Sequence, residues 1–337
     1  MKKQPLSRRG LLVTAAAIAA STHLRAGEAP AGPAARSATA PATVIGLTGP
    51  VGPRGEPRRV RTLLIDKPGL YENYLIDAEW ADVDAVRVRS DKVTLRNCEI
   101  RNARRDGIEV YGADVLIENC RIHHLLAGTF ADQKDAHGIT GRPTRLVVRN
   151  CDIGYVSGDC LQFDPGRGPW SEVLVEQCRL YAGPLPADAA GFKKGESPGE
   201  NAIDTKQRPA NPRSRIVIRN CAVSGFSKGG PISNRAGLNL KNHVEATIEN
   251  CQFFDNEICL RLRGPGKDGE YGGALVTVTD CAFYDTQTAI RTEDSIERLS
   301  IIRPAFGLGV EQKARHVGGT PAGFRLVDER PAPPLPR

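Results

Sequence analysis

One short pattern recurs seven times in this chain of 337 residues and constrains its fold more than any other feature. In each copy an Asn, Gln or Asp precedes a Cys, and a segment of alternating apolar and polar residues, typical of a β-strand, precedes the pair. The pairs are Asn97-Cys98, Asn119-Cys120, Asn150-Cys151, Gln177-Cys178, Asn220-Cys221, Asn250-Cys251 and Asp280-Cys281. The shortest interval, from Cys98 to Cys120, is 22 residues, and the others are longer by insertion. This shortest interval fits one solenoid coil of three short strands.

A second alternating segment follows each pair and predicts another strand in every coil. These segments are 107–110, 138–141, 160–163, 202–205, 237–240, 259–262 and 289–292. Aromatic residues make up only 5% of the chain, which also contains 35 Gly and 24 Pro, so short strands with many turns are expected. The repeat resembles that of the pectate-lyase-like superfamily. This resemblance implies an all-β fold, a single-stranded right-handed parallel β-helix over residues 43–310.

The nine cysteines are predicted to be reduced and buried. Seven occupy one column of the alignment, while Cys160 and Cys259 share another. Stacked side chains in register point the same way rather than at each other, and there is no Cys-x-x-Cys motif, so neither a disulfide ladder nor a metal site is favoured. The Asn before each Cys lies at a bend, where stacked amides can bond one another and the turn backbone.

Aligning the second strands also predicts three outward columns, because side chains alternate between the two faces of a strand. The first column is Asp106, His137, Asp159, Asn201, Ala236, Ile258 and Thr288. The second is Glu109, Thr140, Gln162, Asp204, Asn239, Arg261 and Arg291. The third is Tyr111, Arg142, Asp164, Lys206, Lys241, Arg263 and Glu293. Neighbours within a column are expected about 4.8 Å apart.

The middle coils place several cations in one line, where they would repel one another unless an anionic ligand lies along them. Long insertions at residues 124–136, 181–200, 224–235 and 264–273 are expected to form walls beside the columns. The resulting cleft would fit an extended acidic polysaccharide. The residues expected to bind it are Arg142, Gln162, Asp164 and Asn239.

The chemistry that such a cleft suggests is β-elimination on a polyuronate, in which a base removes the proton next to a carboxylate. Lys206 and Lys241 are stacked on adjacent coils, and each is expected to lower the pKa of the other. Arg261 or Arg263 would hold the substrate carboxylate in a bidentate manner. His137 is another candidate acid or base, because it lies next to Asp159 in the first column.

The segment Glu200-Asn-Ala-Ile-Asp204-Thr-Lys206 resembles the acidic strand of calcium-dependent lyases of the same superfamily. The resemblance implies that Lys206 is the base and that Asp159, Asp204 and Glu200 are oxygen ligands of Ca²⁺. A double-Asp ligand pair that characterises some of these families is missing.

The two ends of the chain have a different composition. Residues 1–29 contain Arg8-Arg9 followed by a short apolar stretch and resemble a twin-arginine export signal, which implies a periplasmic or secreted protein. Residues 30–42 look like an Ala/Pro-rich linker, and residues 311–337 like a tail. No later segment has the roughly 20 apolar residues of a membrane helix. Four Gly-x-x triplets, at Gly46, Gly49, Gly52 and Gly55, are too few for a collagen helix.

Other functions remain open on this scaffold. An inverting glycoside hydrolase would use Asp159 with Asp204 or Asp164, although the sequence signatures of polygalacturonases are absent. A uronate epimerase is another possibility, as is a non-catalytic protein that binds acidic glycans, for which the net charge of +7 is suitable. Nucleic acid is not an expected partner, because aromatic residues for base stacking are scarce. A monomer is expected.

Overall fold

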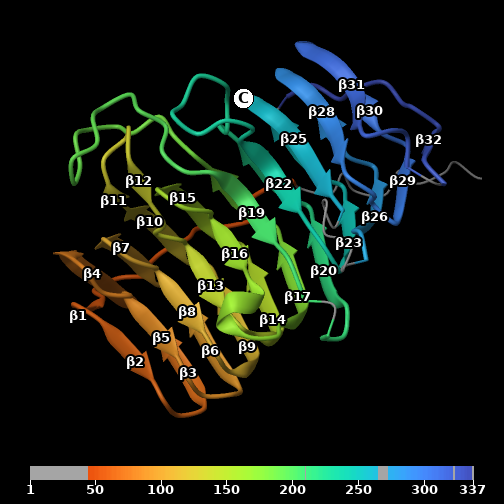
Figure 1. The fold of residues 1–337 in the computed structure, drawn as a ribbon. Helices are drawn as coiled ribbons and strands as arrows, with labels where there is room; N and C mark the ends of the chain where they lie inside the picture. Colours follow the sequence, from red (N-terminus) through yellow and green to blue (C-terminus); the bar gives the residue numbers. More distant parts are fainter. Residues whose placement is uncertain (1–44, 209, 265–271, 322, 336–337) are drawn as a thin grey trace, which may run out of the picture. The chain divides into compact units, whose positions relative to one another are not determined.

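The computed structural model describes residues 45–335 except 209, 265–271 and 322. Within these residues the chain winds through three parallel sheets of ten strands, here called sheets A, B and C, and each coil adds one strand to each sheet (Figure 1). This is the all-β, right-handed parallel β-helix that the sequence predicts. The proposed export signal and linker lie outside the described residues.

The sheets have the following strands. Sheet A contains β1 (Arg58–Val60), β4 (Tyr74–Ala81), β7 (Glu99–Ala103), β10 (Arg121–Leu125), β15 (Asp152–Val156), β18 (Arg179–Tyr181), β21 (Ala222–Ser224), β24 (Gln252–Phe254), β27 (Ala282–Phe283) and β30 (Ala305–Phe306). Sheet B contains β2 (Leu63–Ile65), β5 (Val86–Val88), β8 (Ile108–Val110), β13 (Ile139–Gly141), β16 (Leu161–Phe163), β19 (Asn201–Thr205), β22 (Ala236–Leu240), β25 (Asn256–Arg263), β28 (Thr286–Glu293) and β31 (Val310–Val317). Sheet C contains β3 (Gly69–Glu72), β6 (Val93–Arg96), β9 (Ala113–Glu118), β14 (Thr144–Arg149), β17 (Ser171–Glu176), β20 (Ser214–Arg219), β23 (Val244–Glu249), β26 (Leu275–Thr279), β29 (Arg298–Ile302) and β32 (Arg325–Val327).

Two smaller elements interrupt the coils. The hairpin strands β11 (Ala127–Gly128) and β12 (Gln133–Lys134) pair in the loop after β10, and the 3₁₀ turn η1 (Pro165–Arg167) follows β16. The sheets also extend beyond residue 310, where the sequence predicts a tail, since β31 pairs with β28 and β32 pairs with β29. No described helix has the length and apolar character that crossing a membrane requires.

The predicted alignment of the coils is confirmed by the strand register. The strands that precede each Cys form sheet C, and the second alternating segments form sheet B. Gln162 lies opposite Asp204, Asp204 opposite Asn239, and Asn239 opposite Arg261. Leu, Ile and Val side chains fill the interior, and all nine cysteines are buried free thiols, as predicted.

The Asn of each Asn-Cys pair has a backbone requirement that the repeat alone did not reveal. Asn97, Asn119 and Asn150 have φ values of 53°, 54° and 46°, in the left-handed region that Asn tolerates better than most residues. Their amides also stack as expected, since Asn150 Nδ2 donates to Asn119 Oδ1 at 2.8 Å. The repeated Asn therefore forms the corner between sheets C and A, and we call this row the asparagine ladder.

The first predicted column is buried rather than exposed. Asp106, His137 and Asp159 are at most 3% exposed. Asp106 Oδ1 accepts the backbone N–H of His137 at 2.9 Å, and Asp159 Oδ1 accepts that of Asn201 at 3.0 Å. These side chains lie at the bend that leads into sheet B. There the carboxylates of Asp106 and Asp159 bond the backbone of the next coil instead of facing solvent.

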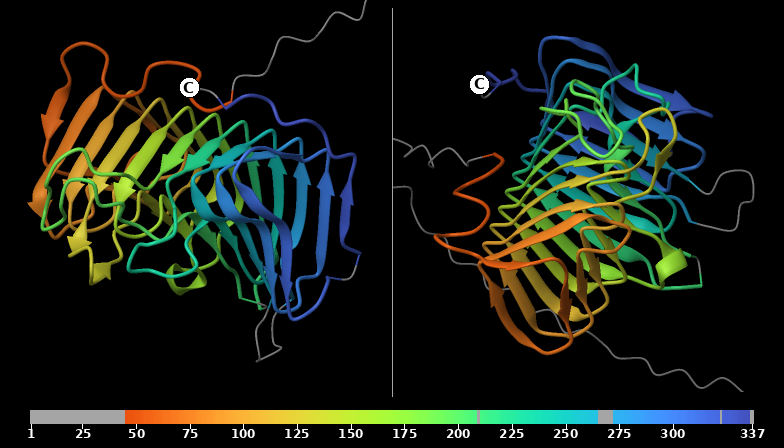
Figure 2. Two further views of the ribbon diagram at one scale, coloured as in Figure 1. Left: turned by 90° about the horizontal axis from the view of Figure 1, so that it is seen from above. Right: turned by 90° about the vertical axis from the view of Figure 1, so that its left-hand side faces the viewer.

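Three of the four predicted wall loops connect sheet A with sheet B. They follow β10, β18 and β21, and in Figure 2 the yellow, green and teal loops project on the same side of the coils. Leu126, Leu185 and Phe192 form an apolar cluster that packs the first two loops together. The fourth loop follows β25 and is only partly described. The walls beside sheet B therefore have their own small core.

Candidate functional site

Charged side chains line the face of sheet B at the ends of β16, β19 and β22. Asp164, Lys206 and Lys241 follow these strands directly. The backbone N–H of Lys206 donates to Phe163 O, and that of Lys241 donates to Thr205 O, so the three residues lie on consecutive coils. The three central residues of the third predicted column therefore lie next to one another, as predicted.

Each lysine is paired with a carboxylate of the preceding coil. Lys206 pairs with Asp164, and Lys241 Nζ lies 2.7 Å from Asp204 Oδ2. The expectation that unpaired cations repel one another along this column is therefore wrong for the two lysines. Carboxylates of the chain itself already balance their charges.

The pKa of Lys206 is raised, not lowered as predicted. Burial pulls it down, but the hydrogen bond and charge of Asp164 outweigh burial, and Asp204 adds to their effect. The stacking of Lys206 and Lys241 predicted the wrong direction for this pKa shift, because the column alignment does not reveal which carboxylates approach the two lysines. The raised pKa favours the protonated form of Lys206.

Three arginines surround Glu293 on the coils that follow. Arg261 contacts its carboxylate in a bidentate manner at 3.0 and 2.9 Å, while Arg291 Nε and Arg263 Nε lie at 2.8 and 3.3 Å. Burial raises the pKa of Glu293, but the arginines outweigh it and the net shift is downward. One carboxylate therefore organises three guanidinium groups and leaves an excess of positive charge.

Arg291 belonged to the second predicted column but was not singled out as a site residue. It pairs in register with Arg261, and its Nη1 donates to Asn234 Oδ1 at 2.8 Å. The signal that would have identified it is the Arg-Arg match between adjacent coils. Asn234, in the loop after β21, holds this arginine from the side.

The other predicted binding residues are more dispersed. Arg142 is exposed, and its guanidinium lies 5.4 Å from the centre of the Tyr111 ring. Gln162 Nε2 donates to Asp159 Oδ2 at 3.3 Å. Asn239 is 4% exposed, and within the described residues its Oδ1 and Asp204 Oδ1 have no hydrogen-bond donor. Those two buried acceptors lie on adjacent coils of the row.

His137 is embedded in the bend rather than presented to the face of sheet B. Its Nδ1 accepts the backbone N–H of Asp159 at 2.9 Å, and its side chain is 2% exposed. A Cβ at Gly158 would lie 2.5 Å from this nitrogen, so glycine is needed for the ring to fit. His137 therefore positions the Asp159 coil and does not reach the surface where a polymer would lie.

The proposed calcium ligands do not fit a calcium site. Lys241 already occupies Asp204 Oδ2, and Asp159 is fully buried with Asn201 and Gln162 on its two oxygens. Glu200 carries a raised pKa because of burial and then the charges of Asp135 and Asp204. Among the described residues no three His, Cys, Asp or Glu side chains form a group that could hold a metal ion.

We expect Asp159→Asn to flatten the pH dependence of stability. Burial, followed by the charges of Asp204 and Glu200, raises the pKa of Asp159 well above its usual range. The folded state therefore binds the proton more tightly, so this contribution favours folding at low pH and is lost as the pH rises toward the folded pKa, by at most about 1.4 kcal/mol per pH unit. Urea unfolding at acidic and neutral pH measures it. Equal pH dependence in variant and wild type would contradict this explanation.

Trp170 supports Lys206 and was missed by the sequence reasoning. Its indole Nε1 donates to the backbone carbonyl of Lys206 at 2.9 Å, and its ring packs 5.3 Å from that of Phe163. Its own carbonyl accepts Gln207 Nε2 at 3.3 Å and Ser214 Oγ. Trp170 lies in the loop after η1, outside every aligned column, so only its rarity as one of two Trp residues marked it.

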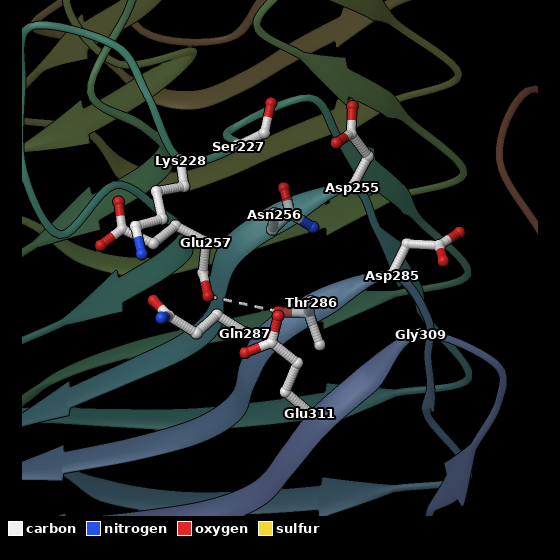
Figure 3. A pocket seen from close by; sticks show the side chains of 10 residues that line it. All are labelled: Ser227, Lys228, Asp255, Asn256, Glu257, Asp285, Thr286, Gln287, Gly309 and Glu311. Carbon is white, nitrogen blue, oxygen red and sulfur yellow. Dashed lines mark hydrogen bonds between the residues drawn. The ribbon is translucent and has the colours of Figure 1, made fainter.

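A hollow of about 320 Å³ lies at the corner where β25, β28 and β31 begin (Figure 3). It is lined by Ser227, Lys228, Asp255, Asn256, Glu257, Asp285, Thr286, Gln287, Gly309 and Glu311. Four of these side chains are carboxylates, and burial raises the pKa of Asp255. An acidic polymer would be repelled here, so the row on sheet B remains the candidate site.

Comparison with known proteins supports the fold class. The family described as "Right handed beta helix region" matches residues 84–183. No curated protein matches the sequence. The mannuronan C-5 epimerase AlgE6 A-module of Azotobacter vinelandii is 17% identical with a TM-score of 0.52, over 80% of this chain and 67% of that chain.

Two lyase structures are also similar. The pectate lyase Pel9A is 14% identical with a TM-score of 0.48, over 83% of this chain and 71% of that chain. The alginate lyase of Paenibacillus sp. str. FPU-7 is 12% identical with a TM-score of 0.49, over 81% and 83%. At these identities the similarity concerns architecture. The chain is a right-handed parallel β-helix protein.

Proposed function

We propose that this protein cleaves an acidic, uronate-containing polysaccharide by β-elimination on the face of sheet B. The observation that carries the proposal is a row of charged side chains on or directly after β16, β19, β22, β25 and β28 of sheet B. This charged row extends through consecutive coils from Asp164 to Arg291. A polymer with one carboxylate on each sugar can lie along such a row. These polymers occur outside the cytoplasm, in agreement with the predicted export signal and a periplasmic or secreted location.

The arginines supply the carboxylate-binding part of the site. Glu293 holds the guanidinium groups of Arg261 and Arg263 in place before a ligand arrives, which reduces the entropy lost on binding. Guanidinium groups bind carboxylates in a bidentate manner. Arg142 would contact the polymer on the other side of the lysines.

Lys206 would act as the base once its amine is unprotonated. It takes the proton from the carbon next to the carboxylate, and the C–H electron pair forms a carbon–carbon double bond. The bond to the neighbouring sugar oxygen breaks, and that oxygen leaves with its electron pair and takes a proton from water, whose hydroxide then takes the proton from the Lys206 ammonium group. A carboxylate neutralised by arginine makes the first step easier, because it stabilises the charge that develops there.

We expect Asp164→Asn to shift the activity profile to lower pH. Burial lowers the pKa of Lys206, while the hydrogen bond and charge of Asp164 raise it and Asp204 adds to their effect, so this pKa should fall when Asp164 is made neutral. Each unit of decrease gives about ten times more free amine at neutral pH. Wild-type turnover should therefore rise through the alkaline range, and the variant should be faster than wild type at neutral pH.

Asp188→Asn is the matched control, because Asp188 forms an exposed pair with Lys193 in a wall loop. Its profile should coincide with that of wild type. An Asp164→Asn profile that also coincides with wild type would show that Lys206 does not limit the reaction.

A panel of acidic polysaccharides tests the proposal itself. The full chain is incubated with each polymer, with added calcium and with a chelator, and the ultraviolet absorbance of an unsaturated uronate is followed. The proposal predicts absorbance with at least one polyuronate. Neutral polysaccharides of similar length are the control and should give none.

A second candidate is a non-catalytic protein that binds acidic glycans, because the raised pKa of Lys206 favours its protonated form. In that case an acidic polymer binds but no product forms at any pH. Arg261→Ala should then weaken binding, while Asp164→Asn should leave the polymer uncleaved.

A further inference from the structure

The four Gly-x-x triplets have no part in the proposed enzymatic function and lie along the asparagine ladder. Residues 45–57 precede β1 and run beside the corner between sheets C and A, as the red segment along the coils in Figure 2. They contain only bends and no regular secondary structure. Several of their backbone N–H and C=O groups bond corner residues of the coils between Asn73 and Asn220.

The contacts begin at the coil of Asn220. The backbone N–H of Gly46 donates to Asn220 O at 2.8 Å. Asn150 Oδ1 then accepts the N–H groups of Thr48 and Gly49 at 2.7 and 3.3 Å, and Asn150 Nδ2 lies 3.4 Å from Gly49 O. The Asn150 amide therefore bonds both N–H and C=O groups of this backbone, as a neighbouring β-strand would.

The contacts continue to the coil of Asn73. Gly52 N–H donates to Asn119 O at 2.8 Å. The N–H of Arg54 donates to Asn73 Oδ1 at 2.6 Å, and its Nε donates to Asn97 Oδ1 at 3.3 Å. Asn73 Nδ2 returns a bond to Glu56 O at 2.9 Å.

The length of the segment matches the ladder. The eight steps from Gly46 to Arg54 extend about 25 Å at the rise of a polyproline II chain, about 3.1 Å per residue. The five coil steps from Asn220 to Asn73 extend about 24 Å at about 4.8 Å each. Gly46 and Gly52 have φ values of 84° and 91°, which favour glycine, so the spacing of the glycines is adapted to this path.

We propose that the asparagine ladder is a binding surface for an extended glycine-rich peptide, and that residues 45–57 occupy it as a strap across the coils from Asn73 to Asn220. The ligand class follows from the contacts and the backbone, because the Asn amides bond backbone groups and because Gly46 and Gly52 have positive φ values. The inference is independent of the proposed enzymatic function.

The strap gives the solenoid a connection that its coils lack. In a solenoid each coil contacts its immediate neighbours, so local opening spreads step by step. A segment bonded to the coils of Asn73, Asn97, Asn119, Asn150 and Asn220 also couples coils that do not contact each other, such as those of Asn73 and Asn119. Asn220 follows β19 and β20, and its coil therefore includes the strand that carries Asp204 and leads into Lys206.

The first experiment is hydrogen exchange on the full chain and on Asn150→Ala. Backbone amides of the coils between Asn73 and Asn220 should exchange at least ten times faster in the variant, while those of the coils after Asn250 keep their protection. Asn250→Ala is the matched control, because it removes a ladder amide that bonds Asn220 but not the strap. Equal effects of the two substitutions on the Asn73–Asn220 coils would overturn the proposal.

The second experiment tests peptide binding to the asparagine ladder directly. The chain lacking residues 45–57 is mixed with a synthetic peptide of that sequence, and binding and the thermal midpoint are measured. The peptide should bind and raise the midpoint, whereas a peptide with Gly46 and Gly52 replaced by Val should not. A peptide that fails to bind the folded deletion variant would contradict the proposal. If the deletion variant does not fold, the full-length Gly52→Val variant replaces it, and Gly318→Val, at another glycine with positive φ, is its control.

For that pair, Gly52→Val should increase hydrogen exchange in the strapped coils, whereas Gly318→Val should not. Equal exchange in the two variants would reject the strap.

Discussion

Lys206→Ala is expected to reduce turnover of an acidic polysaccharide by about 10²- to 10⁴-fold, the usual contribution of a positioned general base. The side chain lies at the centre of the charged row, one coil from Asp164 and one from Lys241. Arg261, Arg263 and Lys241 remain, so the affinity for the polymer should change much less than the turnover number. Initial rates and equilibrium binding, measured on the same preparation, separate the two.

Lys193→Ala is the control for this substitution. Lys193 is an exposed lysine that also pairs with an aspartate, but it lies in a wall loop. It should leave turnover unchanged. If Lys206→Ala lowered affinity and left the turnover number intact, Lys206 would be a binding cation, and the base would have to be another group.

Trp170→Ala is expected to destabilise the folded protein by about 3–5 kcal/mol, as for other fully buried aromatic residues. The side chain is 2% exposed and packs on Phe163, and the substitution also frees the carbonyl of Lys206. Trp170→Phe keeps most of the packing and loses only the indole hydrogen bond, so its cost should be nearer 1 kcal/mol. Denaturant unfolding of both variants measures the difference.

The two variants also separate stability from activity. Trp170→Phe should remain folded but lower the turnover number, because Lys206 loses a fixed backbone contact. A Trp170→Ala cost below that of Trp170→Phe would show that the loop after η1 does not pack as described.

The sequence predicted the coils well because one period governed two of their three strands. Alternation identified the strands of sheets B and C, and the column alignment gave the correct pairing of Gln162, Asp204 and Asn239. Sheet A had no comparable signal. Several of its strands carry a left-handed residue one position before the end, such as Asn102, His124 and Tyr155, which interrupts the alternation.

The site was predicted less completely, for two physical reasons. A column gives the position of a Cβ atom but not the direction of a long side chain, so the pairing of Lys206 with Asp164 and the capture of Arg261 by Glu293 could not be inferred. The first column failed for another reason. Asp159 and His137 are short enough to bond the backbone at the bend, and they are buried there.

The masses of the end products test the central claim most directly. A polyuronate that gives an ultraviolet-absorbing product is digested to completion, and the masses of the resulting oligosaccharides are measured by mass spectrometry. β-Elimination predicts that each new non-reducing end is lighter by one water than the corresponding hydrolysis product, and that Lys206→Ala yields none of these species. Products with the full mass of hydrolysis, or an unchanged polymer that binds tightly, would contradict elimination by Lys206.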